Sequence, residues 1–144
     1  VSQEKNRLYT EGVLNEKELA VLDDASLERF FKSDIGTRLL KSDCVLKEYE
    51  FAFLMKAGEL YPDSAENVRN EEIVVQGKAD CAFLEGDKLV LIDYKSDNLT
   101  DADVFRVRYK SQLDIYARAL TECTGYAVSE RYLYSFKMNE FIKV

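Results

Sequence analysis

The chain of 144 residues has the length of one domain, and 47% of its residues are hydrophobic, enough for a folded core. Its 20 basic and 27 acidic residues give a net charge of −7, which argues against tight DNA binding by this domain alone. It has no histidine, which excludes Ser-His-Asp and Cys-His catalysis and any metal site that needs imidazole. Any chemistry must therefore depend on carboxylates, lysine and tyrosine.

The composition also bears on the cellular compartment. No apolar run approaches the ~20 residues that span a bilayer, and residues 1–7 lack the apolar core of a secretory signal. We therefore expect a cytoplasmic protein without membrane contacts. Cys44, Cys81 and Cys123 are far apart and form no Cys-x-x-Cys pair, which predicts buried, reduced thiols.

The first part of the chain, up to residue 42, has hydrophobic residues at the three-to-four-residue steps of helices. We expect Asp24 or Ser26 to cap the second of these helices. The hydrophobic residues are Leu14, Leu19 and Leu22, followed by Leu27, Phe30, Phe31, Ile35 and Leu39.

Residues 44–55 change to the alternating pattern of a strand, in which Tyr49, Phe51 and Phe53 should face the core. Glu48 and Glu50 then point away from that layer, and the spacing does not choose between them as site residues. Residues 57–72 are polar and contain the only proline, which predicts an exposed loop.

The second half of the chain predicts a hairpin, a long helix and a last strand. Residues 73–84 and 88–95 are strand candidates, and the short turn at residues 85–87 makes the pair antiparallel. A helix is expected over residues 104–123, with Gly125 as its stop, and a strand over residues 130–137. Helices followed by strands, a helix and a strand indicate an α/β domain.

Acidic and basic residues occupy matching positions on the two hairpin strands. Asp93 and Lys95 are two residues apart, so the pleat directs both side chains to one face. A turn near Gly86 sets position 93 across from about position 79 or 80, so Asp80 can lie beside Asp93. Facing carboxylates repel unless a cation separates them, and oxygen ligands favour Mg²⁺ or Mn²⁺. The sequence thus predicts a divalent-metal site in which Lys95 stabilises charge during phosphodiester hydrolysis.

An exposed cross-strand salt bridge is the alternative interpretation of Asp93 and Lys95. However, residues 89–92 form a nearly continuous apolar run, which is typical of a strand buried on both faces. Ionisable residues at the end of such a strand are costly unless they are paired or metal-bound. The surrounding sequence therefore favours a functional site.

The helix expected after the hairpin carries polar residues at four-residue intervals. Arg108, Gln112 and Tyr116 project from one side, where an amide and a phenol suit hydrogen bonds to phosphate oxygens. Arg106 or Arg108 could hold the DNA backbone electrostatically. The alternative is an amphipathic core helix with incidental polar neighbours.

Three motifs follow one another in a characteristic order and spacing. They are Gln76-Gly77-x-x-Asp80, Asp93-Tyr94-Lys95-Ser96-Asp97 and Gln112-x-x-x-Tyr116, preceded by Phe30-Phe31-x-Ser33-x-x-Gly36-x-Arg38. Together they resemble the RecB-like PD-(D/E)XK nucleases, and in particular the C-terminal nuclease domain of the AddA-like branch. The resemblance covers residues 27–136.

This resemblance implies a single nuclease domain over residues 1–144 with a restriction-endonuclease-like core, in which helices flank a central mixed β-sheet. It implies that Asp80, Asp93 and the backbone carbonyl of Tyr94 bind Mg²⁺, for which Mn²⁺ can substitute, and that Lys95 is the catalytic lysine. Gln112 and Tyr116 match a catalytic motif beside the site. Residues 47–51 resemble an Arg-Glu-x-x-Phe pattern, which favours Glu48 as a further ligand.

The implied function is DNA-end processing in double-strand-break repair, as an exonuclease within an AddAB-type helicase–nuclease. A helicase would deliver single strands of DNA, and an AddB-like protein would be the partner subunit. Two alternatives stay open: a catalytically silent nuclease-like docking module in such a complex, and a restriction-type endonuclease.

Two departures from the family pattern matter. RecB-like members usually carry an upstream histidine, so either a longer parent chain supplies it before Val1 or the metal site is incomplete. The start at Val1, without Met, suggests a C-terminal fragment of a longer helicase–nuclease. The cysteine quartet of AddB-like nucleases is missing, which favours the AddA-like branch.

Overall fold

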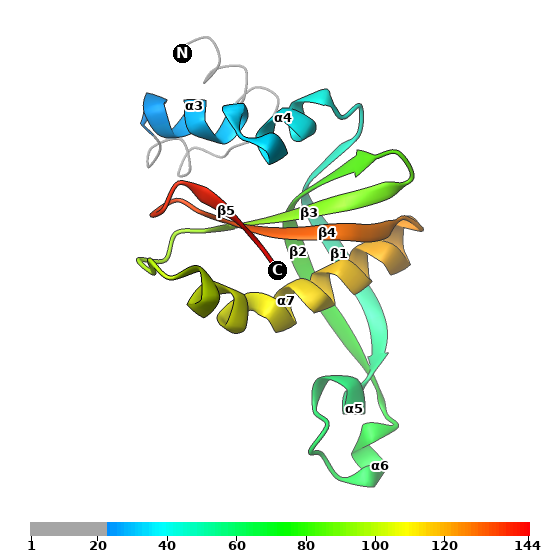
Figure 1. The fold of residues 1–144 in the computed structure, drawn as a ribbon. Coiled ribbons are helices and arrows are strands. Elements are labelled where there is room, and N and C mark those ends of the chain that lie inside the picture. The colour runs from blue at the N-terminus through cyan, green and yellow to red at the C-terminus, as the bar shows by residue number, and fades with distance from the viewer. Residues whose placement is uncertain (1–22) are drawn as a thin grey trace.

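The structure, a computed structural model, describes residues 23–144 as a five-stranded sheet with helices on both faces (Figure 1). The helix expected around Leu14, Leu19 and Leu22 lies outside the described residues. In chain order the elements are α3 (Asp24–Lys32), α4 (Asp34–Lys41), β1 (Val45–Lys56), α5 (Ala57–Leu60), α6 (Glu66–Arg69), β2 (Glu72–Glu85), β3 (Lys88–Lys95), α7 (Ala102–Thr124), β4 (Ala127–Ser135) and β5 (Glu140–Lys143).

The sheet is mixed, with strand order β1-β2-β3-β4-β5. β3 and β4 are parallel, and the other neighbouring pairs are antiparallel. α7 is the crossover between the parallel strands, which is the usual connection for such a pair. The expected α/β fold with a central mixed sheet is therefore confirmed, and it is compatible with a restriction-endonuclease-like core.

Hydrophobic cores lie on both faces of the sheet. In Figure 1, α3 and α4 cover one face and α7 covers the other. The residues 89–92 in β3 contribute to both cores and are at most 1% exposed, so the apolar run is buried on both sides as predicted. The α7 side contains Leu89, Leu91, Phe105, Leu113, Leu120 and Leu133, and the α3–α4 side contains Phe30, Ile35, Leu39, Phe83, Val90, Ile92 and Tyr134.

The helix pair α3–α4 begins one residue earlier than the sequence suggested. Asp23 caps α3, because its Oδ1 accepts a hydrogen bond from the backbone N–H of Ser26 at 2.6 Å. The expectation of Asp24 or Ser26 as the cap is wrong, since Ser26 is the residue whose N–H is capped. Ser33 ends α3 and caps α4, where its hydroxyl accepts from the N–H of Gly36 at 3.0 Å.

The region between β1 and β2 is largely exposed, as expected, but it is not only a loop. It contains α5 and α6, each of four residues, and Ala57 at the start of α5 is buried. Four residues are too few for hydrophobic periodicity to indicate a helix. In Figure 1 the far ends of β1 and β2 project past α7 toward these helices, so the pair forms an arm.

The hairpin and the long helix match their predictions, while the C-terminal region and the cysteines differ. β2 and β3 pair antiparallel, and Gly125 ends α7 with a left-handed φ of 79°. The last predicted strand starts earlier, as β4, and is followed by β5, which was not predicted. None of the three cysteines forms a disulfide, but Cys44 and Cys123 are exposed, so only Cys81 is buried as expected. Within residues 23–144, no helix combines the length and the apolarity needed to cross a membrane.

Candidate active site

The hairpin register brings two carboxylates together. Cys81 pairs with Ile92, and continuing this register by one residue sets Asp80 opposite Asp93. The Oδ2 atom of Asp80 also accepts a hydrogen bond from the backbone N–H of Tyr94 at 2.8 Å, which anchors Asp80 to β3. The convergence predicted from the turn and the strand period is thus present in the structure.

Lys95 forms a buried ion pair with Asp93. Its Nζ lies 2.6 Å from Asp93 Oδ2, and the two side chains are 14% and 3% exposed, respectively. The geometry does not give Oδ2 a directed hydrogen bond, so the contact is one of charge. An exposed salt bridge, the alternative interpretation, does not describe a pair this deeply buried.

Burial and neighbouring charges shift the titration of Asp93. Burial raises the pKa of Asp93 to about 6, with repulsion from Asp80 acting in the same direction, while the Lys95 ammonium opposes the shift. A carboxylate held in this way is stabilised by an additional cation. The raised pKa, together with the burial of Asp93 at the end of β3, marks Asp93 as a candidate functional residue.

Gln112 and Tyr116 extend the site along α7. Gln112 Oε1 accepts a hydrogen bond from Lys95 Nζ at 3.0 Å, and Gln112 Nε2 donates to the Tyr116 hydroxyl at 2.9 Å. The Tyr116 ring packs edge-on against Phe51, with 5.3 Å between the ring centroids. The polar stripe on α7 therefore reaches Lys95 through Gln112, and its role in catalysis stays a prediction.

Tyr109 contacts Lys95 and is hydrogen-bonded to Asp97. The sequence pattern predicted no functional role for either Tyr109 or Asp97. The Lys95 Nζ lies 4.2 Å from the centroid of the Tyr109 ring, and the Tyr109 hydroxyl donates to Asp97 Oδ2 at 2.6 Å. The sequence pattern indicates Tyr109 only as one of the apolar positions of the helix. A signal for it was present, because an aromatic residue three positions before Gln112 lies on the same side of α7.

The two arginines of α7 are held by acidic residues and backbone. Arg108 lies 3.7 Å from Asp97 and remains half exposed at the edge of the site. Arg106 instead contacts Asp103 at 2.5 Å and donates to the carbonyl of Lys143 at 2.8 Å. Arg108 is therefore the better placed of the two for a phosphate, and both DNA contacts stay predictions.

Glu48 lies opposite Asp80 in the β1–β2 register, but its side chain points to solvent. Its carboxylate is 62% exposed and pairs with Lys78 at 3.1 Å, and Glu50 is also exposed. Glu48 has a φ of 45°, unusual for a residue with a side chain, and it marks an irregularity in β1. The role of Glu48 as a ligand stays a prediction.

The irregularity at Glu48 changes which residues face α7. Leu46 and Tyr49 both pack on the α7 side, although residues three apart in a regular strand point to opposite faces. In β2, Ala79 and Ala82 show the same change on either side of Asp80. The two strands therefore switch faces together at the level of the acidic residues.

The residues at the site fit a divalent cation in part. Asp80 and Asp93 supply two neighbouring carboxylates, one of them buried with an oxygen that lacks a hydrogen bond, and Tyr94 lies beside Asp93 in β3. In the part of the chain that the structure describes, no group of three or more Asp, Glu, Cys or His residues is arranged to hold a metal ion. The two carboxylates and one carbonyl would therefore leave other positions of the ion to water or substrate.

The upstream motif around residues 30–38 forms a structural junction between α3, α4 and the sheet. A Cβ on Gly36 would lie 1.9 Å from the Phe30 carbonyl oxygen, so only glycine fits between α3 and α4. Arg38 donates to Glu85 at 2.9 and 2.7 Å and to Glu130 at 3.2 and 2.7 Å, which ties α4 to the β2–β3 turn and to β4. The motif therefore holds the helices on the sheet.

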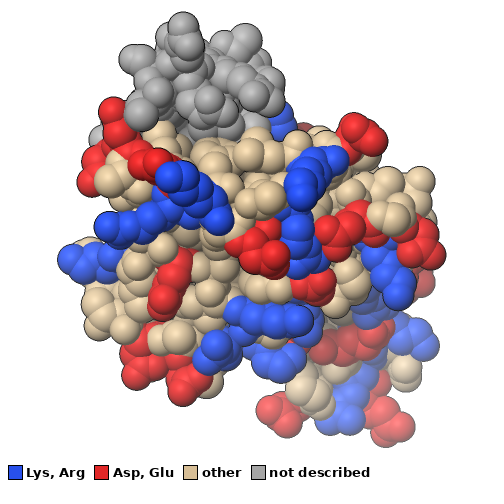
Figure 2. Space-filling view, turned by 45° about the horizontal axis from the view of Figure 1, so that its top comes forward, with Lys and Arg blue, Asp and Glu red and all other residues tan. Residues whose placement is uncertain are grey.

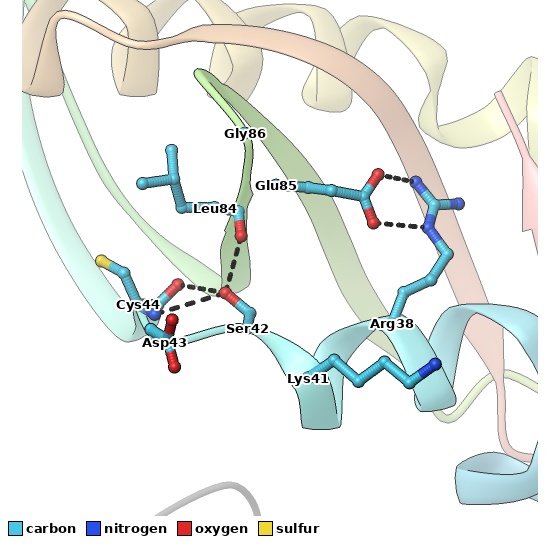
Figure 3. A pocket seen from close by; sticks show the side chains of 8 residues that line it. All are labelled: Arg38, Lys41, Ser42, Asp43, Cys44, Leu84, Glu85 and Gly86. Atoms are coloured by element: carbon cyan, nitrogen blue, oxygen red, sulfur yellow. Dashed lines mark hydrogen bonds and ion pairs between the residues drawn. The ribbon is translucent and has the colours of Figure 1, made fainter.

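Arg38 also lines a surface pocket beside the β2–β3 turn, shown in Figure 3, where the fork to Glu85 forms one wall. On another side of the pocket, the Ser42 hydroxyl is hydrogen-bonded to the backbone carbonyl oxygens of Cys44 and Leu84. The pocket contains none of the predicted site residues. It is lined by Arg38, Lys41, Ser42, Asp43, Cys44, Leu84, Glu85 and Gly86.

The fold and the site define an α/β domain with an acid–amine cluster on a hairpin. Comparison with known proteins shows which proteins of this class the chain is similar to. No protein-family model matches the chain. The A subunit of the ATP-dependent helicase/nuclease of Clostridium botulinum (strain Okra / Type B1) is 33% identical over 145 residues, which cover 100% of this chain and 11% of the relative. The protein of the same name from Thermoanaerobacter sp. (strain X514) is 40% identical over 126 residues, 86% of this chain and 10% of the relative.

The chain is therefore homologous to a segment of the AddA-type subunit of ATP-dependent helicase/nucleases, as its motifs indicated. It spans about a tenth of the length of the curated relatives it matches. Among solved structures, the crystal structure of SSO0001 superposes with a TM-score of 0.48 at 15% identity, covering 98% of this chain and 59% of that one.

Proposed function

We propose that this domain is a metal-dependent nuclease that hydrolyses DNA phosphodiester bonds. The observation that carries the proposal is the buried contact between Asp93 and Lys95, with Asp80 opposite, at the end of a strand buried on both faces. A structural role alone gives little reason to bury one acid against an amine beside a second, partly buried acid. The names of the relatives, which include the word nuclease, support the same activity.

In this proposal Asp80, Asp93 and the Tyr94 carbonyl hold Mg²⁺, for which Mn²⁺ can substitute, and Glu48 is a further candidate ligand. Mg²⁺ bound there would supply the Lewis acidity that hydrolysis needs in a chain without histidine. Lys95 presents a fixed positive charge that stabilises the negative charge developing on the phosphate. Gln112 and Tyr116 orient Lys95 through their hydrogen bonds.

The wider role follows from the relatives and is equally a proposal. The domain would act as an exonuclease in a cytoplasmic AddAB-type helicase–nuclease and process DNA ends in double-strand-break repair, with an AddB-like partner subunit. Its net charge of −7 argues for DNA delivered as single strands by a helicase rather than captured by this domain. Arg108, and less directly Arg106, would contact the DNA backbone at the edge of the site.

Cleavage of labelled single-stranded DNA with Mg²⁺ or Mn²⁺ tests the proposal. We expect Asp93→Ala and Lys95→Ala each to reduce the rate by about 10²–10³-fold, because each removes a group that acts on the developing charge. Asp87→Ala, which changes an exposed acid in the turn of the same hairpin, should retain the wild-type rate. Equal rates for the wild type and the Asp93 and Lys95 variants would refute the proposed site.

The form of the substrate distinguishes the remaining alternatives. An exonuclease degrades linear strands and leaves covalently closed circles intact, whereas a restriction-type enzyme produces discrete fragments from unrelated duplexes. If neither the domain nor a complete helicase–nuclease containing it cleaves DNA with either metal, the silent docking module is the correct interpretation.

A further inference from the structure

We propose that Tyr109, held in place by Asp97, is a positioning residue that fixes the ammonium group of Lys95. The ammonium has three neighbours: the carboxylate of Asp93 at 2.6 Å, the amide oxygen of Gln112 at 3.0 Å and the face of the Tyr109 ring at 4.2 Å from its centroid. A cation at this distance from an aromatic face is attracted by the negative potential above the ring.

The ring is fixed by a hydrogen bond and by packing. Its hydroxyl donates to Asp97 Oδ2 at 2.6 Å, and the ring packs on Phe105 with 5.9 Å between ring centroids. Asp97 is in turn held near Arg108 at 3.7 Å. Burial and the bond to Asp97 raise the pKa of Tyr109, so the phenol keeps its proton and remains a donor.

Arg108 Cζ also lies 5.6 Å from the centroid of the Tyr109 ring, farther than Lys95 Nζ at 4.2 Å, whereas the two polar anchors of Lys95 have second partners of their own. Gln112 is also bonded to Tyr116, and Asp93 is a proposed ligand of the cation, which would draw negative charge away from Lys95. The Tyr109 ring has no lone pair that a cation at Asp93 would use. It can therefore keep the amine in place during the reaction, an inference that rests on the proposed nuclease function.

Two substitutions separate the ring from the hydroxyl. Tyr109→Phe keeps the aromatic face and loses the bond to Asp97, whereas Tyr109→Leu keeps an apolar side chain and loses the face. Tyr126→Leu, at an exposed tyrosine after α7, is the matched control for a Tyr-to-Leu change. A cooperative thermal unfolding transition of each variant establishes that the domain is folded before resonances or rates are compared.

Nuclear magnetic resonance of the 144-residue chain reports the contact without any need for catalysis. The ε-methylene protons of Lys95, adjacent to an ammonium above the ring, should be shifted upfield by the ring current in the wild type and in Tyr109→Phe. The shift should disappear in Tyr109→Leu and persist in Tyr126→Leu. An unchanged Lys95 resonance in Tyr109→Leu would overturn the inference, whatever the activity of the domain.

Kinetics then test the consequence. We expect Tyr109→Leu to lower kcat by about tenfold or more with little change in KM, because a displaced catalytic group affects the chemical step rather than DNA binding. Tyr109→Phe should lower kcat less than Tyr109→Leu does, because it keeps the ring and loses only the bond to Asp97. A wild-type kcat in Tyr109→Leu overturns the positioning role, while a wild type that does not cleave at all overturns the proposed function and leaves the resonance test to decide the contact.

Discussion

At the scale of single residues, the buried carboxylate of Asp93 lowers the stability of the domain while serving the proposed site. The carboxylate is almost completely buried, and its ion pair with Lys95 does not offset the cost of desolvation, since burial still raises the pKa of Asp93 to about 6. At neutral pH the folded domain therefore carries a charge that the unfolded chain would hold more easily. Such a cost is typical of a functional site and has no structural benefit.

Asp93→Asn should consequently stabilise the domain in the absence of divalent ions. Asparagine has nearly the same shape and removes the buried charge, so we expect the free energy of unfolding to rise by roughly 1–2 kcal/mol at about pH 7.5, after the loss of the ion pair is included. Thermal unfolding in a chelating buffer measures this, with Asp87→Asn as the exposed control. A lower unfolding temperature for Asp93→Asn would show that Asp93 serves stability instead.

At the scale of elements, Arg38 joins α4, the β2–β3 turn and β4. Arg38→Met should lower the free energy of unfolding by roughly 2 kcal/mol, because it leaves Glu85 and Glu130 without the partner that they share. Lys32→Met, in an exposed pair with Glu28, is the control and should change it by less than about 0.5 kcal/mol. Chemical denaturation of the three proteins provides the comparison.

The contact between Arg38 and Glu130 should also make the free energy of unfolding depend on pH, and Arg38→Met should weaken this dependence. Hydrogen bonds from Arg38 and Tyr132 lower the pKa of Glu130 to about 2, from an ordinary value of 4.5. A lowered pKa contributes stability that is present above pH 4.5 and is lost as the pH falls toward 2. The wild type should therefore lose stability over this interval more steeply than Arg38→Met. Parallel pH profiles of the two proteins would contradict the assigned junction.

The sequence was sufficient for elements whose pattern repeats and insufficient for short or irregular ones. The turn at Gly86 and the strand period predicted the β2–β3 register, and through it the meeting of Asp80 with Asp93. The four-residue elements α5, α6 and β5 are too short to repeat a pattern. The change of faces at Glu48 depends on one left-handed residue, which spacing does not reveal.

The site residues show the same contrast between what the sequence predicted and what it did not. Spacing put Gln112 and Tyr116 on one side of α7, and the family resemblance implied that they lie beside Lys95, which Gln112 contacts. Tyr109 was missed because a tyrosine at an apolar position of a helix is explained by packing alone. Its contact with Lys95 depends on where α7 crosses β3, which is a property of the tertiary structure.

At the scale of the whole molecule, the charge distribution supports the proposal that DNA is delivered to this domain by another part of a larger assembly. Figure 2 shows acidic and basic side chains interspersed on the face drawn, rather than a continuous basic surface. The net charge of −7 repels the DNA backbone, and Asp80 and Asp93 contribute to that repulsion at the proposed site. A divalent cation between Asp80 and Asp93 would relieve this repulsion where the phosphate must approach.

A crystal of the domain soaked in Mn²⁺ and measured at the manganese absorption edge tests this claim most directly. The account predicts one strong anomalous peak within bonding distance of a carboxylate oxygen of both Asp80 and Asp93, absent from crystals of Asp93→Asn. Carboxylates that keep their positions with no peak between them, or manganese bound only at other acidic residues, would contradict a metal-dependent site on this hairpin.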